Sequence, residues 1–263
     1  MSNIATNKEI FGHPIGLFVL FFTEMWERFS YYGMRAILVL YLVTEVSEKN
    51  PGLGWTNGDA LSLYGTYTMM VYVMSIPGGI IADKWLGQRK SVMLGCLLLV
   101  AGHGILAVEE MWAFYSGLVL IVLGVGMLKP NISTMVGGLY KQGDPKRDGG
   151  FTIFYMGINI GGWIAPLLCG WLAVKYGYHY GFGLAGIGMM AGLIFFWSGI
   201  KKNIFGDKGL PPNKEVYEKT IVGIPQKTFI PLVATLCVPV IAFILSSYKS
   251  ITTDETPIIG EKN

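Results

Sequence analysis

The sequence has few charged residues for its length. Lys, Arg, Asp and Glu together make up 14% of the 263 residues, whereas hydrophobic types make up 52% and the mean hydropathy is +0.49. Soluble domains carry about 25% charged residues, so the composition predicts an all-α integral membrane protein that crosses the bilayer several times. The formal net charge is only +3, with no basic patch. No nucleic-acid partner is therefore expected.

Cysteine is scarce, and the motifs of common catalytic sites are absent. Cys96, Cys169 and Cys237 lie inside apolar segments without the spacing of metal ligands, so buried thiols are expected, with no metal and no cofactor. The patterns GxSxG, HExxH and Walker A do not occur, which argues against a membrane enzyme. The short polar N-terminus precedes an apolar run too long for the core of a signal peptide, so none is expected.

Six or seven stretches approach the roughly 20 apolar residues that a membrane helix requires. They cover residues 14–43, 59–82, 91–108, 112–138, 150–174, 180–200 and 226–247. Basic residues follow the second, fourth and sixth stretches, which places the N-terminus in the cytoplasm by the positive-inside rule. The predicted organisation is a cytoplasmic N-terminus (1–13), a six-helix bundle (14–200), a cytoplasmic linker (201–225), an additional hydrophobic helix (226–247) and a polar tail (248–263).

The first apolar stretch carries a polar face. At about 100° per residue, four side chains fall within an arc of roughly 60° and two more flank it: Glu24, Arg28, Tyr31 and Arg35, then Glu27 and Tyr32. A charge at the bilayer centre costs about 2.5–3.5 kcal/mol on insertion scales, so these charges need mutual pairing, a water-filled cavity, or both. Two interpretations remain open: an ion-pair knot that locks helices together, or a site for a charged substrate or a proton.

Other stretches contain isolated polar residues. Lys129 is the only charge in the fourth stretch, so Glu24 or Glu27 is expected to pair with it. His103 stands alone between two glycines, and such a histidine is more often a hydrogen-bonded packing residue than a proton relay.

The fifth stretch has two different faces. Tyr155 and Asn159 lie on one side, which predicts that Asn159 faces a cavity. Gly157, Gly161 and Ala165 form a small-residue stripe on the other side, which permits close helix packing.

The loop after the second stretch resembles the cytoplasmic loop signature of the major facilitator superfamily. A glycine at 79, Asp83, Gly87 and the basic pair Arg89 and Lys90 give the pattern, with one extra residue before Gly87. The resemblance implies that Asp83, Arg89 and Lys90 act as a gate by pairing across helix ends. An ordinary positive-inside loop is the alternative.

Three further stretches resemble one family of that superfamily, the proton-coupled oligopeptide transporters. Residues 24–33 (EMWERFSYYG) resemble its ExxERFxYYG signature, residues 151–161 (FTIFYMGINIG) its FxxFYxxINxG signature, and residues 126–133 (GMLKPNIS) its helix-four motif. The match covers 14 to about 200. It implies the N-terminal six-helix bundle of a major facilitator fold, with a C-terminal six-helix bundle of the same transporter as its partner. The last stretch resembles the first of two extra helices of bacterial members. Gly65 replaces a histidine that animal members link to protonation, which favours a bacterial type in the inner membrane.

The resemblance also implies a function and its residues. The function is uptake of di- and tripeptides driven by an inward proton gradient, with the proton as coupling ion. Proton coupling would involve Glu24, Glu27, Arg28 and Lys129. Substrate binding would involve Arg28, Arg35, Tyr31, Tyr32, Tyr67, Lys129, Tyr155 and Asn159, of which Arg28 and Lys129 would hold the peptide carboxylate. Arg35 would bind substrate or form a gating salt bridge to the second bundle.

Alternatives to peptide transport remain. A relative of the same fold could carry nitrate or another anion, because a basic pocket suits any anion, although two glutamates beside Arg28 argue for proton coupling. A second alternative is a non-transporting half or fragment. The sequence resembles about half of a transporter, so a truncated chain, a fragmentary gene product and the first part of a longer chain are all compatible with it.

Overall fold

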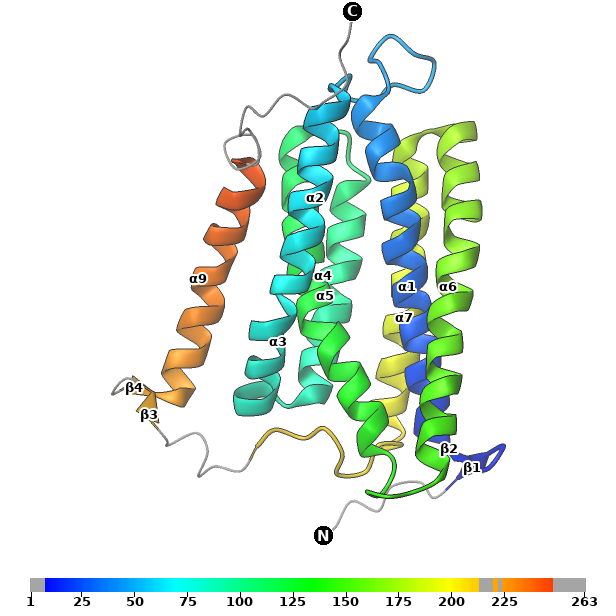
Figure 1. Ribbon diagram of the computed structural model, residues 1–263. Coiled ribbons are helices and arrows are strands. Elements are labelled where there is room, and N and C mark those ends of the chain that lie inside the picture. Colours follow the sequence, from blue (N-terminus) through cyan, green and yellow to red (C-terminus); the bar gives the residue numbers. More distant parts are fainter. Residues whose placement is uncertain (1–7, 213–219, 222–223, 248–263) are drawn as a thin grey trace, which may run out of the picture.

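Long helices that run side by side form most of the protein in the computed structural model (Figure 1). The structure describes residues 8–212, 220–221 and 224–247. The predicted polar tail (248–263), residues 1–7 of the N-terminal segment and parts of the linker lie outside the described residues.

The helices follow the apolar stretches of the sequence closely. They are α1 (Ile15–Val43), α2 (Asn57–Val73), α3 (Ser75–Ile81), α4 (Gln88–Leu106), α5 (Met111–Gly138), α6 (Lys146–Tyr176), α7 (Tyr178–Lys201) and α9 (Gln226–Ser246). The described residues also form two short antiparallel strand pairs: β1 (Glu9–Ile10) with β2 (His13–Pro14), and β3 (Thr220–Ile221) with β4 (Ile224–Pro225).

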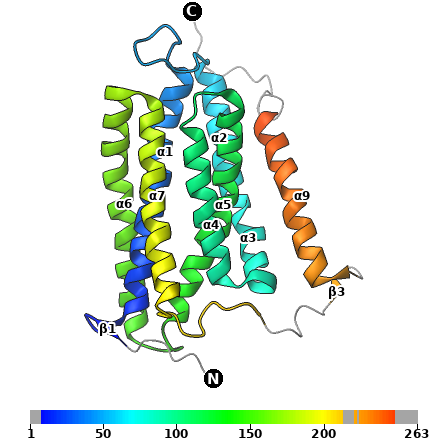
Figure 2. The same cartoon turned by 180° about the vertical axis from the view of Figure 1, so that it is seen from behind.

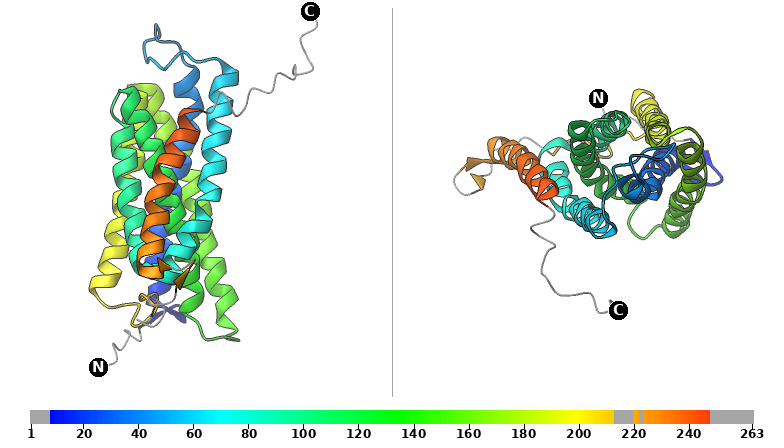
Figure 3. Two further views of the ribbon diagram at one scale, coloured as in Figure 1. Left: turned by 90° about the vertical axis from the view of Figure 1, so that its left-hand side faces the viewer. Right: turned by 90° about the horizontal axis from the view of Figure 1, so that it is seen from above.

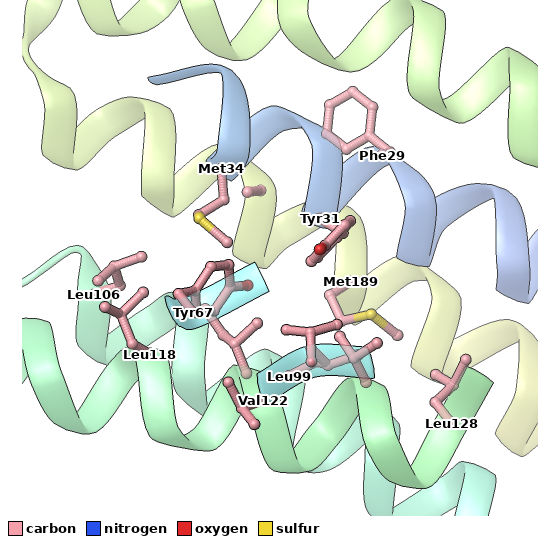
Figure 4. Close-up of a cluster of buried hydrophobic side chains, with 14 of the residues drawn as sticks. Phe29, Tyr31, Met34, Tyr67, Leu99, Leu106, Leu118, Val122, Leu128 and Met189 are labelled. Carbon is pink, nitrogen blue, oxygen red and sulfur yellow. The ribbon is translucent and has the colours of Figure 1, made fainter. Parts of the chain in front are cut away.

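Two helix groups form the bundle. Helix α1 packs against α6 and α7, α4 packs against α5 and α7, and α2 and α3 cover α5. Helix α9 lies at the edge, beside α2 and α3, as the view from above shows (Figure 3). A continuous core of buried side chains joins α1, α2, α4, α5 and α7, and Figure 4 shows its centre, where Tyr31 and Met34 point from α1 toward Tyr67. The charged face of α1 therefore sits inside the bundle.

Five helical stretches are long and apolar enough to cross a membrane: 57–86, 88–106, 111–138, 146–176 and 178–201. Helix α1 has 29 residues but is not among them. Every window of 18 residues in α1 contains at least three of its four charged side chains, Glu24, Glu27, Arg28 and Arg35. The protein is thus an all-α, multi-pass membrane protein whose first helix carries charge into the bundle.

Glycines allow α1 and α6 to approach each other closely. A Cβ atom on Gly161 would collide with the carbonyl oxygen of Met25, and one on Gly157 would meet the ring of Phe21 at 2.9 Å. Ala165, on the same stripe, is fully buried. The predicted small-residue stripe is confirmed as the contact surface of α6 with α1.

The second predicted stretch (59–82) is not one continuous α-helix. Its residues Pro77, Gly78 and Gly79 would favour a break, but the helix continues through them. The boundary lies three residues before Pro77, at Met74 between α2 and α3, and a π-helical turn (Ala82–Leu86) ends the stretch. Gly87 follows with a φ of 76°, a backbone conformation that glycine adopts without steric cost.

Candidate substrate and proton site

Arg28 forms a buried cluster with two glutamates of its own helix. Its Nε donates a hydrogen bond to Oε1 of Glu24 at 2.8 Å and lies 2.7 Å from Oε2 of Glu27 in an ion pair without hydrogen-bond geometry. All three residues are nearly inaccessible, with Glu27 at 0% exposure and Glu24 and Arg28 at 2% and 3%. One guanidinium therefore contacts two carboxylates away from water, and the cluster would carry one more negative than positive charge with both carboxylates ionised.

Several polar atoms of this cluster have no hydrogen-bond partner among the described residues. These include Oε2 of Glu24, Oε1 of Glu27 and Nη2 of Arg28. The buried phenol groups of Tyr31 and Tyr67 also lack partners there. Burying a polar group without a partner costs about 1–3 kcal/mol. The cluster can therefore accept a proton, a water molecule or the polar group of a ligand without first breaking a protein contact.

Arg35 lies two helical turns beyond Arg28 and is held by tyrosines. Its Nε donates to the phenol oxygen of Tyr64 at 2.8 Å, and its Nη2 contacts the same oxygen. The guanidinium also lies over the rings of Tyr64 and Tyr31, at 5.0 and 5.4 Å from their centroids. Arg35 is half-buried and forms no ion pair within the described part of the chain.

Lys129 does not form the expected ion pair. None of the carboxylates in the described residues lies within 4.0 Å of its ammonium group, so the pairing with Glu24 or Glu27 is wrong. Its Nζ lies instead over the ring of Tyr72, 4.5 Å from the centroid. Arg28 forms the ion pairs with both glutamates, and the face of Tyr72 attracts the ammonium group of Lys129 through a cation–π contact. Lys129 remains available to an anion.

The predicted residues of α6 do not join the cluster. Tyr155 is 54% exposed, and Asn159 is exposed as well. The opposite side of α6, which carries the small-residue stripe, contacts α1. Tyr32 lies between the two groups: it is half-buried, its ring is 5.5 Å from that of Tyr31, and it packs against Gly162 of α6. Tyr155 and Asn159 thus face outward from the bundle, and a role in binding requires that a ligand reach that face.

His103 differs from its expected state. The residue is fully buried in α4, but neither ring nitrogen has a hydrogen-bond partner within the described residues. The expectation of a hydrogen-bonded packing histidine is therefore wrong. Its Cβ would be 3.3 Å from a Cβ placed on Gly186, so the side chain sits where α4 crosses α7.

The predicted gate residues do not pair with one another. Asp83 accepts a hydrogen bond from Nε2 of Gln88 at 2.9 Å. The guanidinium of Arg89 donates to the carbonyls of Gly206 and Lys208, and its backbone N–H donates to Gly209 at 3.0 Å. In the described chain neither Arg89 nor Lys90 forms an ion pair with Asp83. The expected pairing is thus wrong here, because the segment after α7 occupies Arg89.

The part of the chain from the start of α4 to the end of α9 matches a known protein family. The sequence profile described as "POT family" matches residues 89–248, which is more than half of the chain. The chain belongs to the POT family. A di-/tripeptide transporter of Lactococcus lactis subsp. cremoris is 44% identical over 241 residues, 91% of this chain and 48% of its own length. The uncharacterized transporter YclF of Bacillus subtilis is 45% identical, over 95% of this chain and 54% of its own length.

Solved structures show the same relationship. A crystal structure of a POT peptide transporter in complex with sulfate superposes with a TM-score of 0.79 at 44% identity, and it covers 94% of this chain and 48% of that protein. The chain therefore spans about half the length of the POT relatives it matches. These relatives bear the names of transporters, as the resemblance of residues 24–33 and 151–161 implies.

Two tyrosines of this POT family chain were not assigned a role from the sequence. Tyr64 holds Arg35, and Tyr72 lies against Lys129. Their position in the tyrosine-rich second stretch was a signal, but which cation each would meet depends on how α2 lies against α1 and α5. Among the described residues no group of three or more His, Cys, Asp or Glu could hold a metal ion. Cys96 and Cys169 are buried, and Cys237 is partly exposed.

Proposed function

We propose that this chain forms the N-terminal half of a transporter that carries di- and tripeptides into the cell together with protons. The observation that carries the proposal is the cluster in which Arg28 shares Glu24 and Glu27 while Lys129 stays unpaired with any described carboxylate. The names of the Lactococcus relative and the POT structure support a peptide as substrate.

The chemistry is a competition for Arg28. While both glutamates are ionised, their charges hold the guanidinium, and another anion gains little by approaching it. A proton on either glutamate removes one of these charges, and the carboxylate of a peptide can then take its place. Proton and peptide therefore bind cooperatively. The proton neutralises a glutamate, and the carboxylate of the peptide then takes the place of that negative charge beside Arg28.

The remaining residues would shape the pocket. Lys129 would give the peptide carboxylate a second cation, and the unpartnered phenols of Tyr31 and Tyr67 would donate to its backbone. Tyr155, Asn159, Tyr32 and Arg35 would complete the site together with a C-terminal six-helix bundle, because alternating access requires two bundles around one site. The basic loops support a bacterial inner-membrane protein with a cytoplasmic N-terminus. The coupling ion would be the proton, with no further cofactor.

The test compares peptides with and without a free C-terminal carboxylate. The transporter that contains this chain is reconstituted in liposomes, and uptake of a labelled dipeptide is competed with the same dipeptide or its C-terminal amide. We expect the amide to compete at least tenfold more weakly, since a charge-assisted contact contributes about 1.5–3 kcal/mol. Arg28→Ala and Lys129→Ala should each reduce uptake of the free peptide strongly.

Lys175→Ala is the matched control. Lys175 is an exposed lysine that also lies over aromatic rings, but at the C-terminal end of α6, away from the cluster. Its substitution should leave uptake unchanged. If the amide competed as well as the free acid, or if both cation variants transported normally, the assignment of the peptide carboxylate to these residues would be wrong.

A further inference from the structure

A groove runs along the outside of the bundle where α4 begins. It has a volume of about 560 Å³. Its walls are apolar: Met93, Leu94 and Leu97 come from α4, and Ile200 comes from the end of α7. Leu97 is 50% exposed. Two cations, Arg89 and Lys90, lie at the end of the groove where α4 starts.

The segment after α7 closes this end of the groove. It returns from α7 beneath α4, as the view from behind shows (Figure 2), and it contributes Leu210 and Pro211 to the wall. Arg89 fixes the segment through the carbonyls of Gly206 and Lys208. The groove therefore has a defined end, because this contact joins two parts of the chain more than 100 positions apart.

The fixed segment is also anchored in the bundle. Phe205 is buried at 1% exposure and packs against Phe196 of α7, with ring centroids 5.7 Å apart. The guanidinium of Arg89 lies 5.7 Å from the centroid of the Phe205 ring. The end of the groove thus rests on a buried aromatic side chain and does not depend on surface contacts alone.

The charge at the end of the groove is positive. Lys90 is exposed and has no ion-pair partner in the described part of the chain. The N–H groups of the Arg89 side chain donate to neutral carbonyls, so no carboxylate is bonded to its positive charge. Asp207 interacts with Arg89 only electrostatically. The end of the groove therefore favours an anion.

Neighbouring residues mark the depth of this site in the membrane. On α7, Trp197 is 52% exposed, and Nζ of Lys201 lies 5.0 Å from the centroid of its ring. Exposed Trp residues and outward-reaching Lys residues are typical of the boundary between hydrocarbon and headgroups. Ile200 of the groove is the immediate neighbour of Lys201. The cationic end thus lies at headgroup level, and the apolar walls extend into the hydrocarbon region.

We propose that this groove binds one anionic phospholipid, with the phosphate group at Lys90 and Arg89 and an acyl chain along Met93, Leu94 and Leu97. The combination selects the ligand. A soluble phosphate would not use the apolar walls, and a zwitterionic lipid brings no net negative charge to the two cations. The site is separate from the buried cluster of α1, and its occupancy does not depend on what the transporter carries.

The test measures lipid binding to the purified protein by native mass spectrometry. The protein is titrated with phosphatidylglycerol, with phosphatidylcholine of the same acyl chains, and with glycerol phosphate. A lysine near the membrane surface contributes about 1 kcal/mol toward an anionic lipid, which corresponds to about fivefold in affinity. We expect one phosphatidylglycerol to bind at least fivefold more tightly than phosphatidylcholine, and glycerol phosphate not to bind detectably.

Two variants and two controls locate the site. Lys90→Gln should remove most of the preference for phosphatidylglycerol, whereas Lys175→Gln, an exposed lysine at the C-terminal end of α6, should keep it. Leu97→Trp fills the groove and should weaken the binding of both lipids at this site. Leu167→Trp, on the exposed face of α6 (58% exposed), should not.

Each outcome decides the proposal. Equal affinities for the two lipids in the unmodified protein would overturn it, as would a preference that survives both Lys90→Gln and Leu97→Trp. Binding of glycerol phosphate at the same affinity would show a simple anion site and would also overturn it. Thermal unfolding of each variant shows whether it is folded. If Lys90→Gln is unstable, the comparison of Leu97→Trp with its control Leu167→Trp decides whether the lipid binds in this groove.

Discussion

Arg35 and Tyr64 form a two-part contact between α1 and α2. The phenol oxygen of Tyr64 accepts a hydrogen bond from Nε of Arg35 at 2.8 Å. The guanidinium carbon Cζ of Arg35 also lies over the ring of Tyr64, 5.0 Å from its centroid. Fully buried arginines are almost always paired; the half-buried Arg35 has its direction fixed by an aromatic side chain. Tyr64 therefore positions a cation that is free to pair with an anion from elsewhere.

We predict that Tyr64→Phe weakens transport by releasing Arg35. The ring, and with it the cation–π contact, remains, but the charge-assisted hydrogen bond of about 1.5–3 kcal/mol is lost. In the transporter that contains this chain, KM for dipeptides should rise by about tenfold or more. Tyr115→Phe, which alters a half-buried tyrosine of α5, should leave KM unchanged. Equal KM values for Tyr64→Phe and the unmodified protein would show that Tyr64 has no positioning role.

Glu24→Gln and Glu27→Gln should separate proton coupling from peptide binding. Glutamine keeps the size of the side chain and one acceptor oxygen but fixes it in a neutral state. At least one of the two variants should lose accumulation driven by a pH gradient and keep peptide-for-peptide exchange, which moves no net proton. Both assays are made on the same liposomes, with Glu48→Gln in an exposed loop as control. Intact accumulation in both variants would move the coupling site elsewhere, with His103 as the next candidate.

Gly161→Ala should destabilise the bundle. The added Cβ collides with the backbone carbonyl of Met25, which cannot move without shifting α1. Overpacking of this kind costs about 1–3 kcal/mol, so the thermal unfolding temperature should fall. Gly170→Ala on the same helix is a matched control, because a Cβ there meets no atom within 4 Å. The prediction fails if the two variants unfold at the same temperature.

Tyr140 should contribute a pH-dependent part of the stability. It lies after the end of α5, and its phenol hydrogen-bonds with Nδ1 of His13 at 2.8 Å. Burial and the carboxylates of Asp144 and Glu9 raise the pKa of Tyr140 to about 12. The folded protein then keeps this proton to higher pH than the unfolded chain, where the pKa of tyrosine is about 10. The contribution is therefore complete below pH 10 and is lost as the pH rises toward 12.

Unfolding measurements on Tyr140→Phe test this sign. The variant should be less stable than the unmodified protein by about 1 kcal/mol at pH 8, because it lacks the hydrogen bond. The difference should shrink at pH 11, since only the unmodified protein loses stability there through this group. A constant difference at both pH values would contradict the proposed linkage.

The sequence determined the helices, because apolar runs of about 20 residues match the length of a helix across a bilayer, and a helix satisfies all its backbone hydrogen bonds internally. It also determined the pairing of Arg28 with Glu24, since residues four apart lie on one helix face, and the face of α6 that packs on α1. These features depend on local periodicity alone.

Only the tertiary structure decided which partners the other polar residues have. Lys129 lies against Tyr72 and not against Glu27, because α2 and α5 bring an aromatic face to it and Arg28 already holds the carboxylate. Arg89 binds the carbonyls after α7, 117 and 119 positions away, and leaves Asp83 to Gln88. The types of the side chains do not determine which of these groups come into contact. That depends on how the helices pack and on where the segment after α7 passes.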